Sequence, residues 1–304
     1  MLLALLSPLI LTSCFTGVES TPKINYREEK GAQKGTSAEE EISNEFRLEP
    51  FSRWENGKAF YVTSPRISLA LSGTTPKTAM PTTGDTIIYL GNRTVTDLTG
   101  DEIVELRFRL AKGGDELIYR TNSTPGKIAE RGTLEVPFTI DLSLVKLAAD
   151  RIRDRRLYIK TNLWSDLDGN ATGGRKFVEV TVTDVLAGNE VYPLKVVFAD
   201  EKGQRHAIFM SAAAGSRWAP REFPSLFSLT DPRLNYPQIS DAVWQKIINS
   251  RVDIGMTKLE ATLALGSPAN IDRGHDHSSA YERWRYSDGV YLIFEDGLLT
   301  RHNQ

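Results

Sequence analysis

The sequence predicts an α+β protein in which two small antiparallel β units precede a C-terminal module of the order ααβββ. The first observation is the strict alternation of apolar and polar residues around 106–110 and 178–182, which is typical of strands with one buried face. The second is an internal repeat between the two strand-rich regions. The third is a pair of capped helical segments near the C-terminus, followed by further strand patterns.

The N-terminus has the features of an export signal. Residues 1–13 are mostly apolar, but the run is shorter than the roughly 20 residues that a transmembrane helix needs, so we interpret it as a signal peptide. The only cysteine follows, and Leu11-Thr12-Ser13-Cys14 resembles the lipobox of bacterial lipoproteins. The resemblance implies cleavage before Cys14 and lipidation of its thiol, with palmitate among the attached acyl chains. An ordinary signal peptide with an unrelated cysteine is the alternative.

The segment after the cysteine has a different composition. Residues 14–53 are polar and charged and lack apolar periodicity, so we expect a disordered tether. Over all 304 residues the formal net charge is -2, and no basic stripe is visible in the sequence. Such a weak overall field does not favour a nucleic-acid or anionic-membrane partner.

The two β units are expected over residues 54–142 and 143–213. Residues 99–121 align with residues 187–211, and a pair of upstream stretches aligns in the same order. Each copy has an opening strand, a long polar loop and then a meander of strands. This order resembles SH3-like barrels, including the bacterial cell-wall-associated kind. A single sandwich built from all the strands is the competing architecture.

A helix and a linker complete this part of the chain. An apolar stripe at helical spacing follows Ser143, a candidate N-cap, and predicts a helix at the start of the second unit. The members of the stripe are Leu144, Val145, Ala148 and Ile152. Residues 214–239 contain four prolines and no sustained period, so we expect an extended linker.

The histidines offer little material for catalysis or metal binding. The chain has four, and the motifs of metalloproteases, serine hydrolases, P-loop proteins and dinucleotide-binding proteins are absent from the sequence. His275, Asp276 and His277 form a His-x-His pair that can supply two metal ligands from a strand. The flanking glycine and serines favour a loop instead.

A second acidic segment resembles the start of a calcium loop. Asp166, Asp168 and Asn170 have the spacing of such ligands, but Ala171 occupies the position at which the EF-hand requires glycine. A tight turn explains the same residues. We therefore expect no catalytic residue, no metal site and no cofactor in this protein.

Residues 240–304 show the most complete helix signals in the chain. Ser240 is a candidate N-cap for a first helix, and Thr257 with Glu260 forms the capping box of a second. Gly266 is placed to end that second helix in a positive-φ conformation. Three strands are expected after it, near 270–272, at 281–286 and at 290–296, and the tight turn Ser287-Asp288-Gly289 joins the last two.

The motifs of this module occur together and in order. They are G-M-T-x-x-E from Gly255, L-G-x-P from Leu265, E-x-W-x-Y from Glu282 and Y-L-x-F-x-D-G from Tyr291. Together they resemble the SmpA/OmlA, or BamE-like, family over residues 240–304. Its best-known member is a small outer-membrane lipoprotein of the β-barrel assembly machinery with an ααβββ fold. None of the motif residues is catalytic.

Two aromatic residues within the third motif leave a question open. Trp284 and Tyr286 stand at alternate positions of a predicted strand and belong either to the core or to a partner-facing surface.

From these observations we expect a lipid-anchored protein of the bacterial cell envelope, in the outer membrane. It would act as a non-catalytic interaction or scaffold module in outer-membrane assembly or maintenance. Its expected partners are the membrane, through the lipid on Cys14, and an envelope protein or cell-wall material, with no nucleic acid. One alternative is an envelope enzyme acting on cell wall or glycans with loop carboxylates. A passive spacer is the other.

Overall fold

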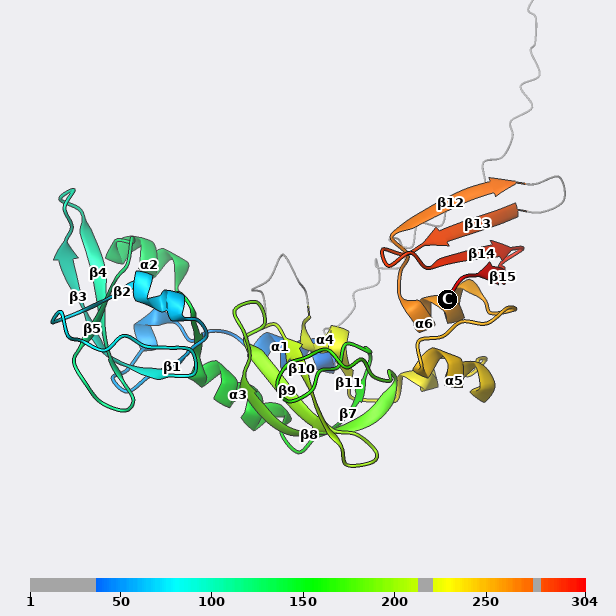
Figure 1. Cartoon of the computed structure of the whole chain (residues 1–304), viewed down its shortest axis with the longest axis horizontal. Helices are drawn as coiled ribbons and strands as arrows, with labels where there is room; N and C mark the ends of the chain where they lie inside the picture. The colour runs from blue at the N-terminus through cyan, green and yellow to red at the C-terminus, as the bar shows by residue number, and fades with distance from the viewer. Residues whose placement is uncertain (1–36, 213–220, 276–279) are drawn as a thin grey trace, which may run out of the picture. The chain divides into compact units, whose positions relative to one another are not determined.

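Residues 37–212, 221–275 and 280–304 are described by the computed structural model. Within these ranges the chain is an α+β protein with three antiparallel sheets, which confirms the predicted fold class (Figure 1). The strands of the first sheet are β1 (Ala59–Val62), β2 (Leu71–Gly73), β3 (Thr86–Thr96), β4 (Glu102–Leu110), β5 (Leu117–Arg120) and β6 (Thr139–Asp141). They lie in the order β2-β5-β4-β3-β1-β6.

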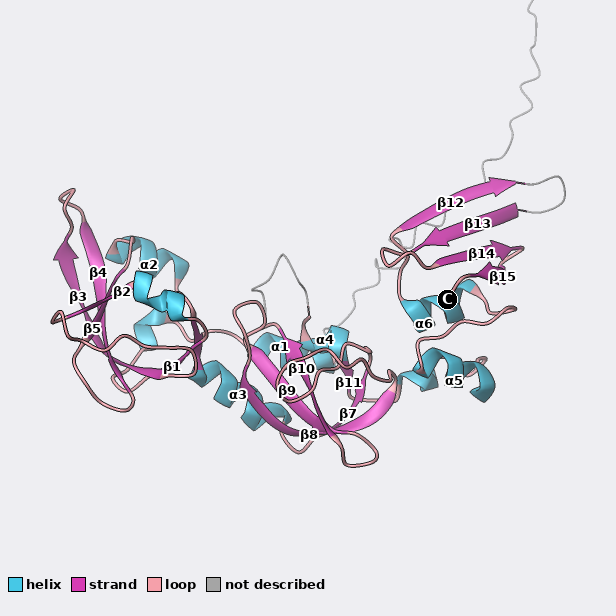
Figure 2. Ribbon diagram, in the orientation of Figure 1, coloured by secondary structure: helices cyan, strands magenta, loops and turns pink. Residues whose placement is uncertain are grey.

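The second sheet repeats the strand order of the first. Its strands are β7 (Arg156–Ile159), β8 (Val178–Ala187), β9 (Leu194–Ala199), β10 (Arg205–Met210) and β11 (Phe227–Ser228). Strands β10-β9-β8-β7 are neighbours in the same way as β5-β4-β3-β1, and both sheets curl (Figure 2). The register shifts between Tyr89 and Gly91 in β3 and between Val182 and Asp184 in β8. The repeat found in the sequence is therefore a repeat of sheet topology.

Part of the expected linker belongs to the second sheet. Residues 214–239 were expected to be an extended connection, but α4 (Phe223–Leu226) and β11 lie within them, and β11 pairs with β7. The side chains of Phe223, Leu226 and Phe227 are at most 3% exposed in the core of this sheet. Their burial stabilises residues 223–228 on the second sheet, because it removes large apolar surfaces from water.

Part of the expected tether is also folded. The helix α1 (Ala38–Glu45) lies inside the range 14–53, where the sequence predicts disorder. Ile42 and Phe46 are each 1% exposed and pack in the same core as α4. A short helix can pack on a core with few apolar residues, all on one side. The acidic residues of α1 dominate its sequence, so Ile42 and the following Phe46 do not give a recognisable pattern.

The predicted connecting helix is present with a different N-cap. It is α3 (Leu142–Ile152), and its stripe from Leu144 to Ile152 is buried as expected. Asp141 is the cap rather than Ser143, because its Oδ1 accepts the backbone N–H of Ser143 at 2.8 Å. The remaining helices of this part are α2 (Pro125–Arg131) and the short 3-10 turns η2 (Phe51–Arg53), η3 (Pro65–Leu69) and η4 (Pro232–Asn235).

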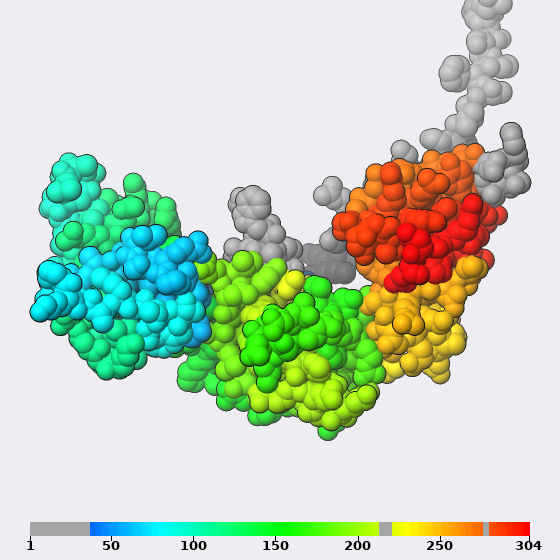
Figure 3. Space-filling view, viewed as in Figure 1, coloured from blue at the N-terminus to red at the C-terminus, as the bar shows by residue number. Residues whose placement is uncertain are grey.

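The C-terminal module has one more strand than predicted. Its elements are α5 (Asp241–Ile248), α6 (Lys258–Leu265), β12 (Asn270–His275), β13 (Ala280–Arg285), β14 (Tyr291–Glu295) and β15 (Leu298–His302). The fourth strand, β15, follows the turn at Asp296-Gly297 and buries Leu299 opposite Phe294. Helices α5 and α6 share one hydrophobic core with the sheet. The module is gold to red in the space-filling view (Figure 3).

The predicted helix caps of this module are confirmed. Ser240 Oγ accepts the backbone N–H of Val243 at the start of α5. The capping box at the start of α6 is complete, with Thr257 Oγ1 accepting from the N–H of Glu260 and the Glu260 carboxylate accepting from the N–H of Thr257. Gly266 ends α6 with φ 85°. These caps explain the local pattern fully without a functional role.

Candidate functional site

The predicted lipid site lies outside the described residues. Cys14 is in the segment 1–36, so lipidation at this residue stays a prediction from the sequence. Among the helices that the structure describes, none combines the length and apolarity needed to cross a bilayer.

The His-x-His pair is only partly described. His275 is the last residue of the edge strand β12 and is exposed, while Asp276 and His277 are not among the described residues. Across the described ranges, no three His, Cys, Asp or Glu side chains lie together in a way that could hold a metal ion.

The segment that resembles a calcium loop is a hydrogen-bonded turn. Oδ1 of Asp166 accepts the backbone N–H groups of Asp168 and Asn170, and Oδ2 accepts the side-chain amide of Asn170 at 2.9 Å. The hydrogen bond from Asn170 lowers the pKa of Asp166. Both carboxylate oxygens are already engaged within the turn, as expected of an Asx turn.

Trp284 and Tyr286 belong to the core of the C-terminal module. Trp284 is 6% exposed, and its Nε1 donates to Oε2 of Glu282 at 3.0 Å. Tyr286 is half-buried against the same core, and its hydroxyl donates to the carbonyl of Gly266 at 3.1 Å. The open choice between core and partner surface is thus decided for the core.

Three loop carboxylates that an enzyme could use are engaged in turns. The hydroxyl of Thr99 lowers the pKa of Asp97, and the backbone N–H of Thr82 lowers the pKa of Asp85 to about 2. Burial acts to raise the pKa of Asp200, but the backbone N–H groups of its own turn outweigh burial and lower it. A catalytic general acid requires a raised pKa instead, so that the carboxyl group is protonated near neutral pH.

The first sheet carries a polar face of a different kind. Strand β4 points Leu106, Phe108 and Leu110 into the core, and its alternate residues 105, 107 and 109 point to the other side. The register places Arg93 of β3 and Arg120 of β5 beside Glu105. We call this surface the arginine face; it consists of Arg93, Arg107, Arg109 and Arg120, together with Glu105 and Glu116.

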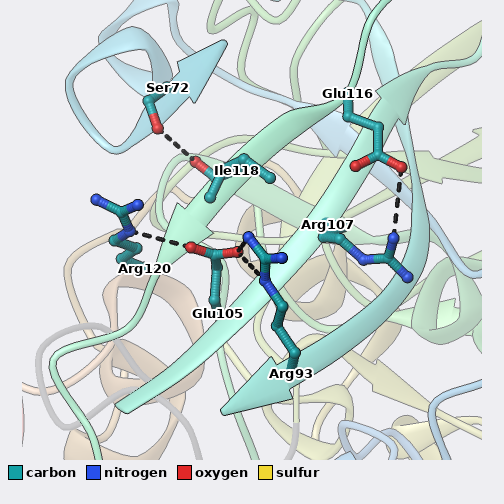
Figure 4. A network of polar contacts seen from close by, with 7 residues as sticks. All are labelled: Ser72, Arg93, Glu105, Arg107, Glu116, Ile118 and Arg120. Carbon is teal, nitrogen blue, oxygen red and sulfur yellow. Dashed lines mark hydrogen bonds and ion pairs between the residues drawn. The ribbon is translucent and has the colours of Figure 1, made fainter. Parts of the chain in front are cut away.

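Glu105 is the centre of the arginine face. Its side chain is fully buried, yet both carboxylate oxygens are bound by arginines of the neighbouring strands (Figure 4). Oε1 lies 2.6 Å from Nε and 2.6 Å from Nη2 of Arg93, and Oε2 lies 3.0 Å from Nε of Arg120. Burial acts to raise the pKa of Glu105, but the hydrogen bonds from Arg120 and Arg93 outweigh burial and lower it. The carboxylate therefore stays charged and fixes both guanidinium groups.

The two arginines remain accessible although Glu105 is not. The side chains of Arg93 and Arg120 are 60% and 67% exposed. A buried carboxylate below two exposed guanidinium groups aligns them and restricts their rotamers, while leaving donors on the solvent side.

Arg107 is held more loosely than these two. Its Nη1 lies 3.5 Å from Oε1 of Glu116, and its Nε is enclosed without an acceptor among the described residues (Figure 4). It lies opposite Gly91, where an added Cβ would be 3.4 Å from Nη2 of Arg107. The Arg107 guanidinium therefore lies close to the backbone of β3 at Gly91.

Arg109 completes the row on β4. It is exposed, and no hydrogen bond or ion pair joins it to another described residue. Four arginines thus share this face with two glutamates, and the face carries an excess of positive charge. The arginine face could not be recognised in the sequence, because its arginines come from three strands and form no continuous basic stripe along the chain. The alternating arginines of "ELRFRL" were the available signal.

Comparisons with known proteins returned no match to a protein family, to a curated protein or to a solved structure.

Proposed function

We propose that the protein is a lipid-anchored, non-catalytic interaction module of the bacterial cell envelope, held in the outer membrane through Cys14. In this proposal the two repeated sheets are SH3-like units, and residues 240–304 are a BamE-like module. The whole protein serves outer-membrane assembly or maintenance. The arginine face carries the binding role. The observation behind it is the buried carboxylate of Glu105, which holds two exposed arginines in fixed positions.

The chemistry of this face supports binding rather than catalysis. Arginine side chains stay protonated in proteins, so they donate hydrogen bonds but do not exchange protons at neutral pH. The pKa of Glu105 is lowered and both of its oxygens are engaged. A surface with these properties can orient an anionic group, and Glu105, which is buried and paired, is not available as a general acid or base.

The alternative of a glycan-acting enzyme has less support. It requires a protonated carboxyl group with a raised pKa beside a second carboxylate. Within the described ranges, every aspartate and glutamate with a resolved shift has a lowered pKa. Release of soluble fragments from cell-wall sacculi by the purified full-length protein would favour the enzyme.

The anchor is tested first. Cells expressing the wild type and Cys14→Ala are labelled with a fatty acid, and the label on the immunoprecipitated protein is compared. We expect label on the wild type and none on the variant. Equal labelling of both proteins contradicts the anchor.

The binding role is tested by crosslinking in intact envelopes. The full-length protein is crosslinked, solubilised in detergent and purified, and the bound material is analysed. Arg107→Gln/Arg109→Gln removes two charges from the arginine face without touching the pairs of Glu105. We expect this variant to lose the crosslinked material. Arg153→Gln/Arg156→Gln removes two exposed, ion-paired arginines near the second sheet and serves as the matched control. Equal recovery from all three proteins contradicts the proposal.

A further inference from the structure

We propose that the arginine face binds repeated phosphate groups of an anionic envelope polymer. The inference rests on the proposed function, because it names the chemical class of the ligand that the interaction module holds. It follows from the donors that remain free, from their spacing and from the side chains that surround them.

The free donors are arranged for a ligand with several oxygens. Arg93 uses Nε and Nη2 on Glu105, and Arg120 uses only Nε. Nη1 of Arg93 and both terminal nitrogens of Arg120 therefore have no acceptor within the described residues. The planar guanidinium group binds phosphate oxygens through paired hydrogen bonds. Because Glu105 fixes both groups, less side-chain entropy is lost when a phosphate binds.

The spacing of the donors favours a repeating ligand. Arg93 and Arg120 lie on β3 and β5, which flank β4, and their guanidinium groups meet at the carboxylate of Glu105. Arg107 and Arg109 follow on β4 at a step of about 7 Å for two residues. A single small anion cannot reach all of these positions. A linear polymer with a charge in each repeat can contact several of them at once.

Two of the four arginines can bind without giving up a strong partner. Arg107 makes one long contact of 3.5 Å, to Glu116, and its Nε has no acceptor among the described residues. Arg109 has no ion pair within the described chain. A phosphate that contacts these two groups therefore gains charge-assisted hydrogen bonds and displaces only one weak interaction.

The surrounding side chains argue against a protein or a membrane as the occupant. Protein interfaces depend on aromatic and apolar anchors, and membrane-binding surfaces insert apolar side chains. The apolar neighbours of the arginines, Val95 and Ile118, are half-buried in the sheet. Leu98 is fully exposed at the tip of the β3–β4 hairpin, but it lies between Asp97 and Asp101, which an anionic bilayer would repel.

Phosphate fits this arrangement better than carboxylate. The oxygens of a phosphate point in tetrahedral directions, so one group can accept from guanidinium groups of two neighbouring strands. A carboxylate has only two oxygens, which lie in one plane, and the Glu105 carboxylate uses both to hold Arg93 and Arg120. A phosphate has more oxygens in more directions, so it can engage more of the remaining donors at once.

The test measures binding of linear polyphosphate to the detergent-solubilised full-length protein at several salt concentrations. Arg107→Gln/Arg109→Gln is expected to weaken binding about tenfold or more and to reduce the salt dependence. Arg93→Lys/Arg120→Lys keeps the charge but loses the forks, so we expect weaker binding with a similar salt dependence. Arg153→Gln/Arg156→Gln, the matched control, is expected to stay within about twofold of the wild type.

A separate variant addresses the buried charge. Replacing Arg93 and Arg120 by neutral residues alone would leave Glu105 charged and unpaired, which can unfold the sheet. Arg93→Gln/Glu105→Gln/Arg120→Gln removes the carboxylate together with both partners. Circular dichroism establishes that it is folded, and we expect its affinity for polyphosphate to fall at least as far as that of Arg107→Gln/Arg109→Gln.

Several outcomes overturn the inference. Unchanged affinity in the arginine-face variants is one, and binding of polyglutamate as tight as binding of polyphosphate is another. Binding to phosphatidylglycerol vesicles but not to polyphosphate assigns the face to the membrane instead. If Arg107→Gln/Arg109→Gln loses its crosslinked envelope partner but keeps its affinity for polyphosphate, the proposed function stands and this ligand class is wrong. If polyphosphate binding falls as expected but crosslinking recovers nothing, the ligand class stands and the envelope role fails.

Discussion

The Nζ atom of Lys58 lies 2.7 Å from Oδ2 of Asp141, and both side chains are buried, at 3% and 6% exposure. The same Nζ lies 2.8 Å from Oε2 of Glu49 and 3.1 Å from Oγ of Ser143. One ammonium group, directly before β1, therefore joins the segment before the first sheet to the end of β6 and the beginning of α3. Asp141 has a second role here, because it also caps α3.

Loss of this ammonium group is expected to destabilise the first sheet. Lys58→Met leaves the buried Asp141 without its cation, and we expect a loss of about 3 kcal/mol or more in the free energy of opening. Lys58→Met/Asp141→Asn is expected to recover part of that loss, since asparagine can still cap α3. Hydrogen exchange of the backbone amides of β1 measures the free energy of opening in each variant. Lys112→Met, at an exposed lysine, is the control, and an equal effect there contradicts the prediction.

The helix α1 is expected to be part of the stable fold rather than of a tether. Phe46 is 1% exposed and packs edge-on against Phe223. Phe46→Ala is expected to lower the free energy of unfolding of the second sheet by about 3 kcal/mol or more, through lost burial and the cavity that remains. Arg47→Ala, at the adjacent exposed residue, is expected to change it by less than about 0.5 kcal/mol. Similar urea midpoints for both variants would show that α1 does not stabilise the core.

The hydroxyl of Tyr286 is expected to make the C-terminal module sensitive to alkaline pH. Burial, with a contribution from Asp288, raises the pKa of Tyr286 from 10.0 to about 12. A raised folded-state pKa means that the stabilisation is complete below pH 10.0 and is lost as the pH rises towards about 12. Phenolate absorbance should therefore show a late-titrating tyrosine. Because burial also raises the pKa values of Tyr119 and Tyr158, Tyr286→Phe should reduce the late component by one tyrosine, and Tyr291→Phe should leave it unchanged. An unchanged late component in Tyr286→Phe contradicts the assignment.

Gly174 is expected to tolerate no side chain, because Trp164 lies against it. A Cβ at residue 174 would lie 2.0 Å from Cδ2 of Trp164, a buried ring that packs against Phe198. Gly174→Ala is expected to displace this ring and to cost about 1–3 kcal/mol. The control is Gly126→Ala in α2, where nothing lies within 4 Å and alanine is a better helix former. Tryptophan fluorescence and the melting temperature should change only in Gly174→Ala.

Several elements of the fold could be predicted because their causes are local. The capping box of α6 joins Thr257 to Glu260, three residues away, and the apolar stripe of α3 repeats within one helix. The strands of both meanders follow from alternation of period two. In each case the interacting groups are close in sequence, so the local sequence pattern is enough to predict the element.

Elements whose stability comes from distant partners were missed. The helix α1 depends on α4, more than 170 residues later in the chain, and β11 depends on pairing with β7. Strand β15 is an exception, because its partner Phe294 is close to Leu299 in sequence; it was missed because residues 298–302 show no alternation of apolar and polar residues. Short segments of this kind carry too few apolar residues to be recognised alone, because burial against another element is what orders them.

The sequence by itself determined the α+β class, the repeated strand order and the caps of the C-terminal helices, and it supplies the lipobox-like motif at Cys14. The tertiary structure decided the arginine face. Arg93, Glu105 and Arg120 lie on three strands, and Glu105 is 12 residues from Arg93 and 15 residues from Arg120 along the chain. The net charge of -2 gives no sign of the face. Only the pairing of β3, β4 and β5 collects these residues on one side of a sheet, where a buried carboxylate can hold two guanidinium groups.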